Sequence, residues 1–485
     1  MMIREFDMKK TIILLSAALL FLTGCHPKGP DTPEQKGLYY ANYFAYNMMG
    51  TYYLWIDEIS EAFSHWGYYD DPIQKVYDIR YKDSAGEDID KWTRVTDDFS
   101  SLAGSVSGNT KTYGLDYSLY YSDETRKNIC AVVRYTYAGS PAADAGLKRG
   151  DIILKINGKT LTESNYYDII VGELSGGDHV LLTLADGREI SLDAVQMYEN
   201  PIGVNTIFDT GSKRIGYLHY TNFTLDSCKD LQTVFRHFKE SGVTELILDL
   251  RYNTGGYAAT EAFLASMIAP EKEVTGKSVF TTEVHNKKMS EEDTGDAETR
   301  FSTTHGISSG GSIRFIDISN ALLAPSKVYF LVSESSASAS ESLIGGLAPY
   351  IDMTVIGTKT YGKFCSGLIV SAKQWYEAAK DQIDATTFEE GVRYTDNWGI
   401  YVMYGRYADK DGKTLSMPDG IEPDILLKDN PLDGHELGSP AETMLAKALS
   451  LAGYEMAREE TTSPAVIPVQ GAPTREGFRV RTLPR

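Results

Sequence analysis

Apolar and aromatic residues recur at helical spacing near the beginning of the chain and at strand spacing further along. Between residues 38 and 63 tyrosines and other apolar residues stand three or four positions apart, which predicts a small helical module over residues 38–100. Short apolar runs separated by turn dipeptides such as Asn157-Gly158 follow. They predict a compact β-rich domain over residues 101–198.

The longest region alternates strand-like and helix-like runs. Between residues 199 and 455, the runs RIGYLHY, ELILDL, KVYFLVS and GLIVSA alternate with amphipathic segments such as LQTVFRHFKESG. Such alternation is typical of an α/β layer architecture. Residues 456–485 lack periodicity and are predicted to form a flexible tail. The fold class is therefore predicted to be α/β, in a mixed multidomain chain.

The first residues indicate a processing signal and not a structural element. Residues 9–25, KKTIILLSAALLFLTGC, place two lysines before an apolar run that is shorter than the roughly 20 residues of a spanning helix. The ending LTGC resembles the bacterial lipobox, in which the cysteine is lipidated and the preceding peptide is removed. We therefore expect a signal peptide over residues 1–24, a lipidated Cys25 and a polar tether over residues 25–37. An ordinary signal peptide with an incidental cysteine is the alternative.

Lipidation would decide where the protein resides. Acyl chains on Cys25 contribute roughly 0.8 kcal/mol per buried methylene, so several of them would hold the protein on a membrane surface. We therefore expect a protein secreted across the cytoplasmic membrane and lipid-anchored in the bacterial cell envelope.

Composition and charge exclude several other classes of protein. The 485 residues are 42% apolar, enough for a sizeable core, so the chain as a whole is not disordered. The formal net charge of -20 opposes a broad grip on phosphate backbones, and nucleic acid is not an expected partner. The 4 cysteines are scattered and provide neither a disulfide framework nor a CxxC-type zinc cage. No metal or organic cofactor is expected.

Two short motifs resemble catalytic signatures but lack the surroundings that the chemistry needs. GISSG, residues 306–310, places Ser308 in a GxSxG pattern, yet its flanks are polar where a nucleophile elbow needs a strand and a helix. GTKTYGK, residues 357–363, fits the GxxxxGK of a phosphate-binding loop, but Phe364 follows where magnesium binding requires a hydroxyl. Neither motif is therefore expected to carry the function.

A third motif, SSASASES at residues 335–342, stands between the strand-like run KVYFLVS and the helix-like run SLIGGLAPY. Small residues allow a tight strand-to-helix turn, and the free N–H groups of a helix N-terminus can stabilise a developing oxyanion. A nucleophilic serine fits such a turn. Taken alone, however, the same serines favour a simple helix cap.

In combination with other motifs, this turn resembles the C-terminal processing peptidases, a family of serine peptidases with a serine-lysine dyad and a PDZ domain. The family's SASASE signature matches Ser338 as the nucleophile and Glu341 three residues on, and its later GK motif matches Lys363. The resemblance implies an α/β catalytic core of the ClpP/crotonase-like type with an inserted or preceding PDZ-like domain. Further motifs in the family's order are GYLHYTNF (216–223), DLRYNTGG (249–256) and GIEPDI (420–425).

The resemblance also implies a division of roles at the active site. Ser338 would attack the scissile carbonyl while Lys363 takes its proton, and N–H groups of Ala339 and of Gly255 or Gly256 would form the oxyanion hole. A serine hydroxyl needs such a base, and a lysine can serve only if burial lowers its pKa toward the working pH.

The third catalytic partner stays open. Many relatives carry a glutamine four residues after the lysine to orient it, and this chain has Gly367 there. On a helix, Glu341 shares a face with Ser338, so its carboxylate is predicted to orient the lysine or the hydroxyl. A histidine triad is the rival mechanism. Its best candidate, His219, stands on a core strand between tyrosines and suits a structural role better.

The β-rich domain resembles a PDZ domain over residues 140–161, SPAADAGLKRGDIILKINGKTL. PDZ domains bind a peptide as an added strand and capture its terminal carboxylate on backbone N–H groups. The corresponding peptide-binding loop would include Gly114 and Leu115. Asp116 places a negative charge where the carboxylate would dock, so the domain is expected to gate the active site or to grip internal segments instead of binding C-termini. A PDZ fold that has only a structural role is the alternative.

Together these features predict a lipid-anchored serine endopeptidase that cleaves exported or envelope polypeptides. Its partners would be polypeptide substrates and, through the anchor, a membrane. The alternative is a non-catalytic lipoprotein that uses the PDZ-like groove and the cleft as a peptide-binding scaffold.

Overall fold

The computed structural model describes residues 30–122, 124–292, 298–309, 312–363, 365–413, 419–455, 467–468 and 478–481. The predicted signal peptide, Cys25 and the first part of the tether lie outside these residues. The first described element, α2 (Pro33–Tyr52), begins inside the predicted tether. Pro33 occupies its first turn, and Thr32 and Gln35 cap each other's backbone N–H groups. Residues 33–37 are therefore helical and not part of a tether.

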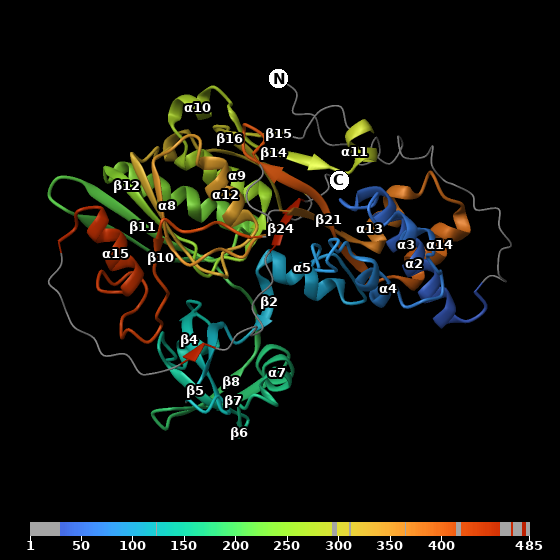
Figure 1. The fold of residues 1–485 in the computed structure, drawn as a ribbon, viewed down its shortest axis with the longest axis horizontal. Helices are drawn as coiled ribbons and strands as arrows, with labels where there is room; N and C mark the ends of the chain where they lie inside the picture. The colour runs from blue at the N-terminus through green and yellow to red at the C-terminus, as the bar shows by residue number, and fades with distance from the viewer. Residues whose placement is uncertain are drawn as a thin grey trace.

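A six-stranded sheet forms the centre of the larger lobe (Figure 1). Its order is β10-β11-β12-β18-β19-β22; β10 is antiparallel to β11 and the other neighbours are parallel. Helices α8, α9 and α12 pack on one face and α15 on the other, which explains why ELILDL of β12 is buried on both sides. The predicted α/β fold class is confirmed. The bounds are β10 (Ile202–Asp209), β11 (Arg214–Tyr220), β12 (Val243–Asp249), β18 (Lys327–Val332), β19 (Met353–Gly357), β22 (Ile425–Leu426), α8 (Cys228–Glu240), α9 (Ala258–Ile268), α12 (Ala339–Leu347) and α15 (Thr443–Leu451).

A second sheet joins this lobe to the helices at the beginning of the chain. Its order is β13-β24-β20-β21-β14-β15, with β1 paired to β21. The residues predicted as a helical module share one hydrophobic cluster with β20, β21 and α13. Together with these elements they form the second lobe of the molecule (Figure 1). The bounds are β1 (Arg94–Thr96), β13 (Gly255–Tyr257), β14 (Val279–His285), β15 (Glu298–Arg300), β20 (Cys365–Ser371), β21 (Gly399–Ala408), β24 (Phe478–Arg481), α3 (Ser60–Ser64), α4 (Pro72–Ile79), α5 (Phe99–Ser107), α13 (Ala372–Ala379) and α14 (Ala385–Tyr394).

The β-rich domain hangs below the two lobes in Figure 1 and has its own hydrophobic core. Its strands run in the order β3-β4-β5-β7-β8, with β6 paired to β5, and a short pair β2-β9 leads into it. The bounds are β2 (Asn109–Thr112), β3 (Leu115–Tyr121), β4 (Ile129–Thr136), α6 (Pro141–Asp144), β5 (Ile152–Ile156), β6 (Lys159–Thr160), α7 (Tyr166–Ile169) continued by η2 (Ile170–Ser175), β7 (His179–Leu184), β8 (Glu189–Asp193) and β9 (Val195–Tyr198).

The segment predicted to be a flexible tail contains two strands. β23 (Ile467–Pro468) pairs with β3 of the β-rich domain, and β24 lies between β13 and β20 in the second sheet. Figure 1 shows β24 in red at the centre of the molecule, between the two lobes. A strand of four residues is too short to produce a readable alternation, so its position is fixed by its partners.

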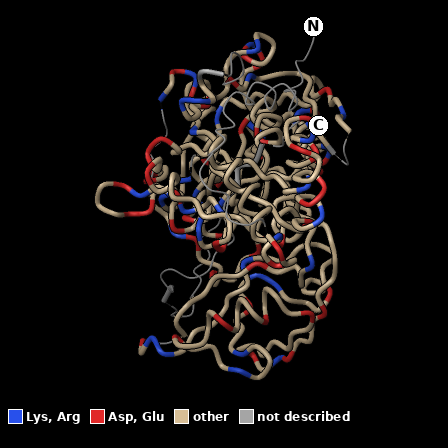
Figure 2. Tube along the Cα trace, turned by 90° about the vertical axis from the view of Figure 1, so that its right-hand side faces the viewer, with Lys and Arg blue, Asp and Glu red and all other residues tan. Residues whose placement is uncertain are grey.

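Two further observations concern the surface. No helix among the described residues has the length and apolar character needed to cross a membrane. Figure 2 shows acidic and basic residues interspersed along the described trace.

Candidate active site

The predicted nucleophile, Ser338, lies in the turn between β18 and α12. Its φ of 60° and ψ of -112° place it in a region that serine seldom adopts, and such strain is concentrated at functional sites. The residue is fully buried, and its Oγ has no hydrogen-bond partner among the described residues. A hydroxyl in this state at the N-terminus of a helix is available for chemistry.

The other small residues of the turn fasten it to the end of β12. Ser336 Oγ donates a hydrogen bond to the Leu250 carbonyl at 2.8 Å. The Asn253 carbonyl accepts from Ser340 Oγ at 3.0 Å and from the Ala337 N–H at 3.1 Å. The serines of SSASASES therefore hold the nucleophile turn against the segment that leads to the predicted oxyanion glycines.

Glu341 joins the nucleophile turn to the segment that carries the lysine. Its Oε2 accepts from the backbone N–H groups of Ser338 and Lys363, each at 2.8 Å. Its Oε1 accepts from Thr360 Oγ1 at 2.6 Å and from the Gly362 N–H at 2.7 Å. Burial raises the pKa of this carboxyl, and the four donors oppose that shift. Glu341 thus holds together the two backbone segments that carry the predicted nucleophile and the predicted base.

Lys363 is buried completely, and this burial lowers the pKa of its amine from 10.5 to about 7. Its Nζ lies 3.3 Å from the Tyr401 hydroxyl, and 4.9 and 5.1 Å from the ring centres of Tyr401 and Trp92. In this arrangement the amine faces the tyrosine, and the Ser338 hydroxyl is not its hydrogen-bond partner. The lysine therefore has the pKa of a general base at neutral pH.

Tyr401 occupies the space that a side chain at position 367 would fill. A Cβ built on Gly367 would lie 2.2 Å from the Tyr401 ring and 2.8 Å from the Met403 side chain. The tyrosine reaches Lys363 from β21, the strand next to β20. At position 367, where many relatives carry glutamine, this chain has glycine, and the Tyr401 side chain fills the space that this leaves. Tyr401 therefore contacts the lysine in place of a residue at position 367.

A second tyrosine of β21 holds the serine and lysine segments at a fixed separation. The Tyr407 hydroxyl lies 2.9 Å from the Ser338 carbonyl oxygen and 2.8 Å from the Lys363 carbonyl oxygen. Because one hydroxyl contacts both carbonyls, the two backbones lie side by side.

The predicted oxyanion glycines differ in their surroundings. The Gly255 N–H donates to Asn253 Oδ1 at 2.8 Å, and the Gly255 carbonyl accepts from the Phe223 N–H at 2.9 Å. Gly256 has a φ of 144°, and a Cβ on it would lie 2.5 Å from the Phe223 carbonyl oxygen, so only glycine fits. Ala339 is the first residue of α12, where backbone N–H groups have no partner within the helix.

The rejected motifs and the histidine alternative find no support in the fold. Ser308 lies in the β16 (Thr304–Ser309) and β17 (Ser312–Asp317) hairpin, opposite Ile313, and not in a strand-to-helix turn. Residues Cys365–Ser371 form β20, so the GxxxxGK segment is followed by a strand and not by a helix. His219 is buried between the rings of Tyr135 and Tyr252, and burial lowers its pKa to about 4.

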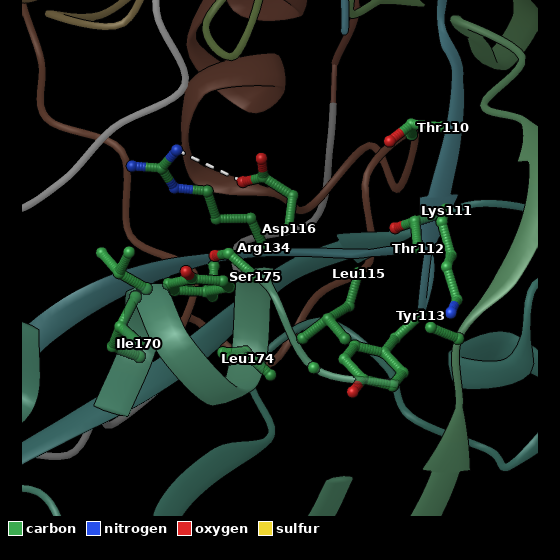
Figure 3. A pocket seen from close by; sticks show the side chains of 14 residues that line it. Thr110, Lys111, Thr112, Tyr113, Leu115, Asp116, Arg134, Ile170, Leu174 and Ser175 are labelled. Atoms are coloured by element: carbon green, nitrogen blue, oxygen red, sulfur yellow. Dashed lines mark hydrogen bonds and ion pairs between the residues drawn. The ribbon is translucent and has the colours of Figure 1, made fainter. Parts of the chain in front are cut away.

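The β-rich domain contains a groove of about 310 Å³ between β3 and the helical segment α7–η2 (Figure 3). Leu115 of the predicted peptide-binding loop lines it, and Gly114 precedes this residue with a φ of 76°. Asp116 forms an ion pair with Arg134 at 3.3 Å. This partner offsets the negative charge that opposed the docking of a carboxylate. The other lining residues are Thr110, Lys111, Thr112, Tyr113, Tyr117, Ile170, Val171, Leu174, Ser175, Gly177 and Ala194.

A buried arginine fastens the β-rich domain to the larger lobe. Arg149, from the LKRGD segment, donates to the Tyr252 hydroxyl at 2.7 Å and to Asp429 at 2.8 Å. Tyr252 directly precedes Asn253, whose Oδ1 accepts from the Gly255 N–H. Arg149 therefore contacts a residue adjacent to the one that holds the predicted oxyanion segment. The groove and the nucleophile turn are therefore connected through one short chain of contacts.

Sequence reasoning missed three aromatic residues of the site: Trp92, Tyr401 and Tyr407. They come from β21 and from the region before β1, and their local sequence carries no sign of contact with the lysine. Asn253 lies within the quoted motif DLRYNTGG, so its importance could have been inferred from that motif. Among the described residues, no group of three or more His, Cys, Asp and Glu side chains is placed to hold a metal ion.

Comparison with known proteins identifies both parts of the chain. Residues 214–427 match peptidase family S41, and residues 132–185 match a PDZ domain. The chain is 24% identical over 377 residues to a carboxyl-terminal-processing protease of Synechocystis, covering 76% of this chain and 75% of that protein. It is 26% identical over 257 residues to a probable CtpA-like serine protease of Staphylococcus aureus. This match covers 52% of the chain, which spans only 45% of that relative.

One solved structure shares the fold. A putative S41 protease from Bacteroides fragilis superposes with a TM-score of 0.61 at 21% identity, covering 89% of this chain and 99% of that one. The resemblance to C-terminal processing peptidases that carry a PDZ domain is therefore confirmed at the level of family and fold.

Proposed function

We propose that this chain is a serine endopeptidase that cleaves polypeptides with Ser338 and Lys363, because residues 214–427 match peptidase family S41 and residues 132–185 match a PDZ domain. The observation that supports this most strongly is the pairing of a strained serine, whose hydroxyl is unpaired, with a buried lysine whose pKa is about 7. Both features favour nucleophilic catalysis at neutral pH.

In the proposed mechanism, the Lys363 amine turns from Tyr401 to Ser338 and takes the proton of its hydroxyl. The Ser338 oxygen forms a bond to the scissile carbonyl carbon, and the carbonyl oxygen becomes an oxyanion. Lys363 then gives the proton to the leaving amine as the peptide bond breaks. Water hydrolyses the acyl-enzyme by the same proton transfers in reverse and regenerates the serine.

The oxyanion would be held by the N–H groups of Ala339 and Gly256. Gly255 is less suited to this role because its N–H already donates to Asn253 at 2.8 Å. Each such donor is worth about 3 kcal/mol in the transition state. Glu341 would act as a positioning residue, since it accepts hydrogen bonds from the backbone N–H groups of both Ser338 and Lys363.

The PDZ groove would bind a segment of the substrate beside β3 and thereby present or gate it. The ion pair of Asp116 with Arg134 leaves such a groove compatible with a terminal carboxylate. The sequence LTGC further supports a lipid anchor at Cys25, which would place the enzyme on a membrane of the cell envelope and make exported polypeptides its substrates.

Incubation with casein tests the proposal. The parent protein should cleave casein, whereas Ser338→Ala should be inactive and retain the same fold by circular dichroism. Ser308→Ala removes a hydroxyl of the rejected GISSG motif and serves as a matched control that should keep full activity. Full activity of Ser338→Ala would contradict the proposal. If parent and variant are both inert but bind peptides, the protein is a peptide-binding scaffold.

A further inference from the structure

The second sheet contains a gap one strand wide, and the C-terminal segment of this chain fills it. β24 is parallel to β13 on one side, where Val480 stands opposite Tyr257. It is parallel to β20 on the other, where the same Val480 stands opposite Gly367. β13 carries the predicted oxyanion glycines, and β20 begins two residues after Lys363. The gap therefore runs between the two halves of the catalytic centre.

The register places the C-terminal segment beside the predicted oxyanion glycines. Phe478 and Arg479 stand opposite Gly255 and Gly256. A polypeptide that is to be cleaved must present its scissile carbonyl to the oxyanion donors and to Ser338. An extended backbone along β13 satisfies this requirement, so β24 occupies the path that a substrate has to take.

The same segment also occupies the open edge of the PDZ domain. Ile467 and Pro468 stand opposite Tyr121 and Tyr120 of β3, in antiparallel register. β3 is the strand that lines the PDZ groove, and added strands bind PDZ domains at this type of edge. Two separate stretches of the C-terminal segment thus lie on the two surfaces that a substrate would contact.

We propose that residues 467–468 and 478–481 bind in cis as an internal pseudosubstrate, in which the first stretch fills the PDZ edge and the second fills the catalytic gap until a polypeptide substrate displaces them. This inference rests on the proposed function, because it identifies the occupied gap with the substrate path. The ten steps from Pro468 to Phe478 span at most about 33 Å, enough for one chain to bridge two neighbouring sites.

Because the C-terminal segment belongs to the same chain, even a low affinity for its two binding sites is enough to keep it bound. A segment that belongs to the same chain as its binding site has an effective concentration of about 1 mM, so a segment with a Kd of about 100 μM would be bound roughly nine-tenths of the time. Competing peptides would then bind about tenfold more weakly to the intact chain than to a chain whose segment is released.

The experiment uses the full chain with Ser338→Ala, so that binding is measured without cleavage. The probe is a fluorescein-labelled peptide with the sequence of residues 474–485, and its binding is followed by fluorescence anisotropy. A second substitution, Val480→Pro, removes the N–H of the residue that faces both neighbouring strands and should release the segment. The peptide should bind this variant about tenfold more tightly than the Ser338→Ala chain.

Two matched controls isolate the effect. Arg475→Pro introduces proline outside β24 and should leave the affinity of the chain for the peptide unchanged. A peptide that itself carries Val480→Pro has the same charge as the probe and should bind neither chain. Equal affinity of the probe for the Val480→Pro chain and for its Ser338→Ala parent, or equal binding of the proline peptide, would overturn the proposal.

Hydrogen exchange gives a test that does not depend on the folding of a variant. Amides of residues 478–481 in the unmodified chain should exchange more slowly than those of an unstructured peptide, because β24 is paired on both sides. Exchange at the rate of an unstructured peptide would overturn the proposal. Neither measurement uses catalysis. Inactivity toward casein would therefore refute the proposed peptidase function, and the binding and exchange results would still show whether the C-terminal segment occupies these two sites.

Discussion

Replacement of the buried lysine should stabilise the fold, and the gain should depend on pH. Lys363 is fully buried with a pKa of about 7, whereas the unfolded chain has a lysine pKa near 10.5. Between these two values the unfolded state binds a proton that the folded state has lost. The free energy of unfolding therefore rises with pH across this window. Within the window, the buried lysine destabilises the fold most near pH 7.

The pKa difference sets the size of the effect. It corresponds to a cost of about 4 kcal/mol at pH 7 and about 1 kcal/mol at pH 10 relative to a side chain that does not titrate. Lys363→Met keeps most of the volume and removes the charge. It also loses the 3.3 Å contact with the Tyr401 hydroxyl, a loss of about 1 kcal/mol. The stabilisation by methionine should thus shrink by about 3 kcal/mol between pH 7 and pH 10.

Urea unfolding at several pH values, followed by tryptophan fluorescence, measures this change. Trp92 is a local probe, since its ring centre lies 5.1 Å from the lysine amine. Lys373→Met, at an exposed position of α13, controls for the substitution itself. A stability difference between Lys363→Met and the parent that stays constant from pH 7 to pH 10 would refute the assignment of a depressed pKa, and with it the reason for choosing this lysine as the base.

Three further outcomes follow from the same geometry. The kcat/KM for peptide cleavage should rise with pH through about 7, as the Lys363 ammonium loses its proton, and a profile that is flat from pH 5.5 to 8.5 would contradict this role. Tyr401→Phe removes an acceptor of the ammonium; it should lower kcat about tenfold and move the acidic limb of that profile to lower pH, a shift that loss of packing alone would not cause. Gly256→Ala should cost about 3 kcal/mol in thermal unfolding and abolish cleavage, because the new Cβ would lie 2.5 Å from the Phe223 carbonyl oxygen. Gly242→Ala, with a φ of 71° but open space around it, should cost about 1 kcal/mol and leave cleavage unchanged; equal losses at the two glycines would show that the close approach is unimportant.

The parts of the site that the sequence predicts are those encoded by local patterns. SSASASES follows an apolar strand and precedes a helix, so the turn at Ser338 can be placed from strand and helix periodicity alone. The start of α2 was also readable, because Thr32, Pro33 and Gln35 form a recognisable N-terminal capping pattern, and it was missed by treating this stretch as a tether.

The remaining parts depend on contacts between segments that are distant in sequence. Tyr401 contacts Lys363 although the two residues are 38 positions apart in the sequence. The glycine at position 367 does not by itself indicate which side chain fills the space next to it. β24 has only four residues and is defined by its pairing on both sides, so no periodicity marks it. Sheet partners and cross-strand packing decide these features, and a single sequence does not display them.

The lysine's burial also assigns a role to the lobe formed by the first helices. Trp92 and Tyr401 enclose the Lys363 amine, and both belong to the hydrophobic cluster that α2 and α13 share with β20 and β21. The rings of this lobe therefore contribute to the burial that lowers the lysine's pKa. The nucleophile and the environment of the base lie on two different sheets, which the contacts of Tyr407 with the Ser338 and Lys363 carbonyl oxygens hold together. Any change that loosens the contact between the sheets should rehydrate the lysine, raise its pKa and switch off the base before the fold is lost.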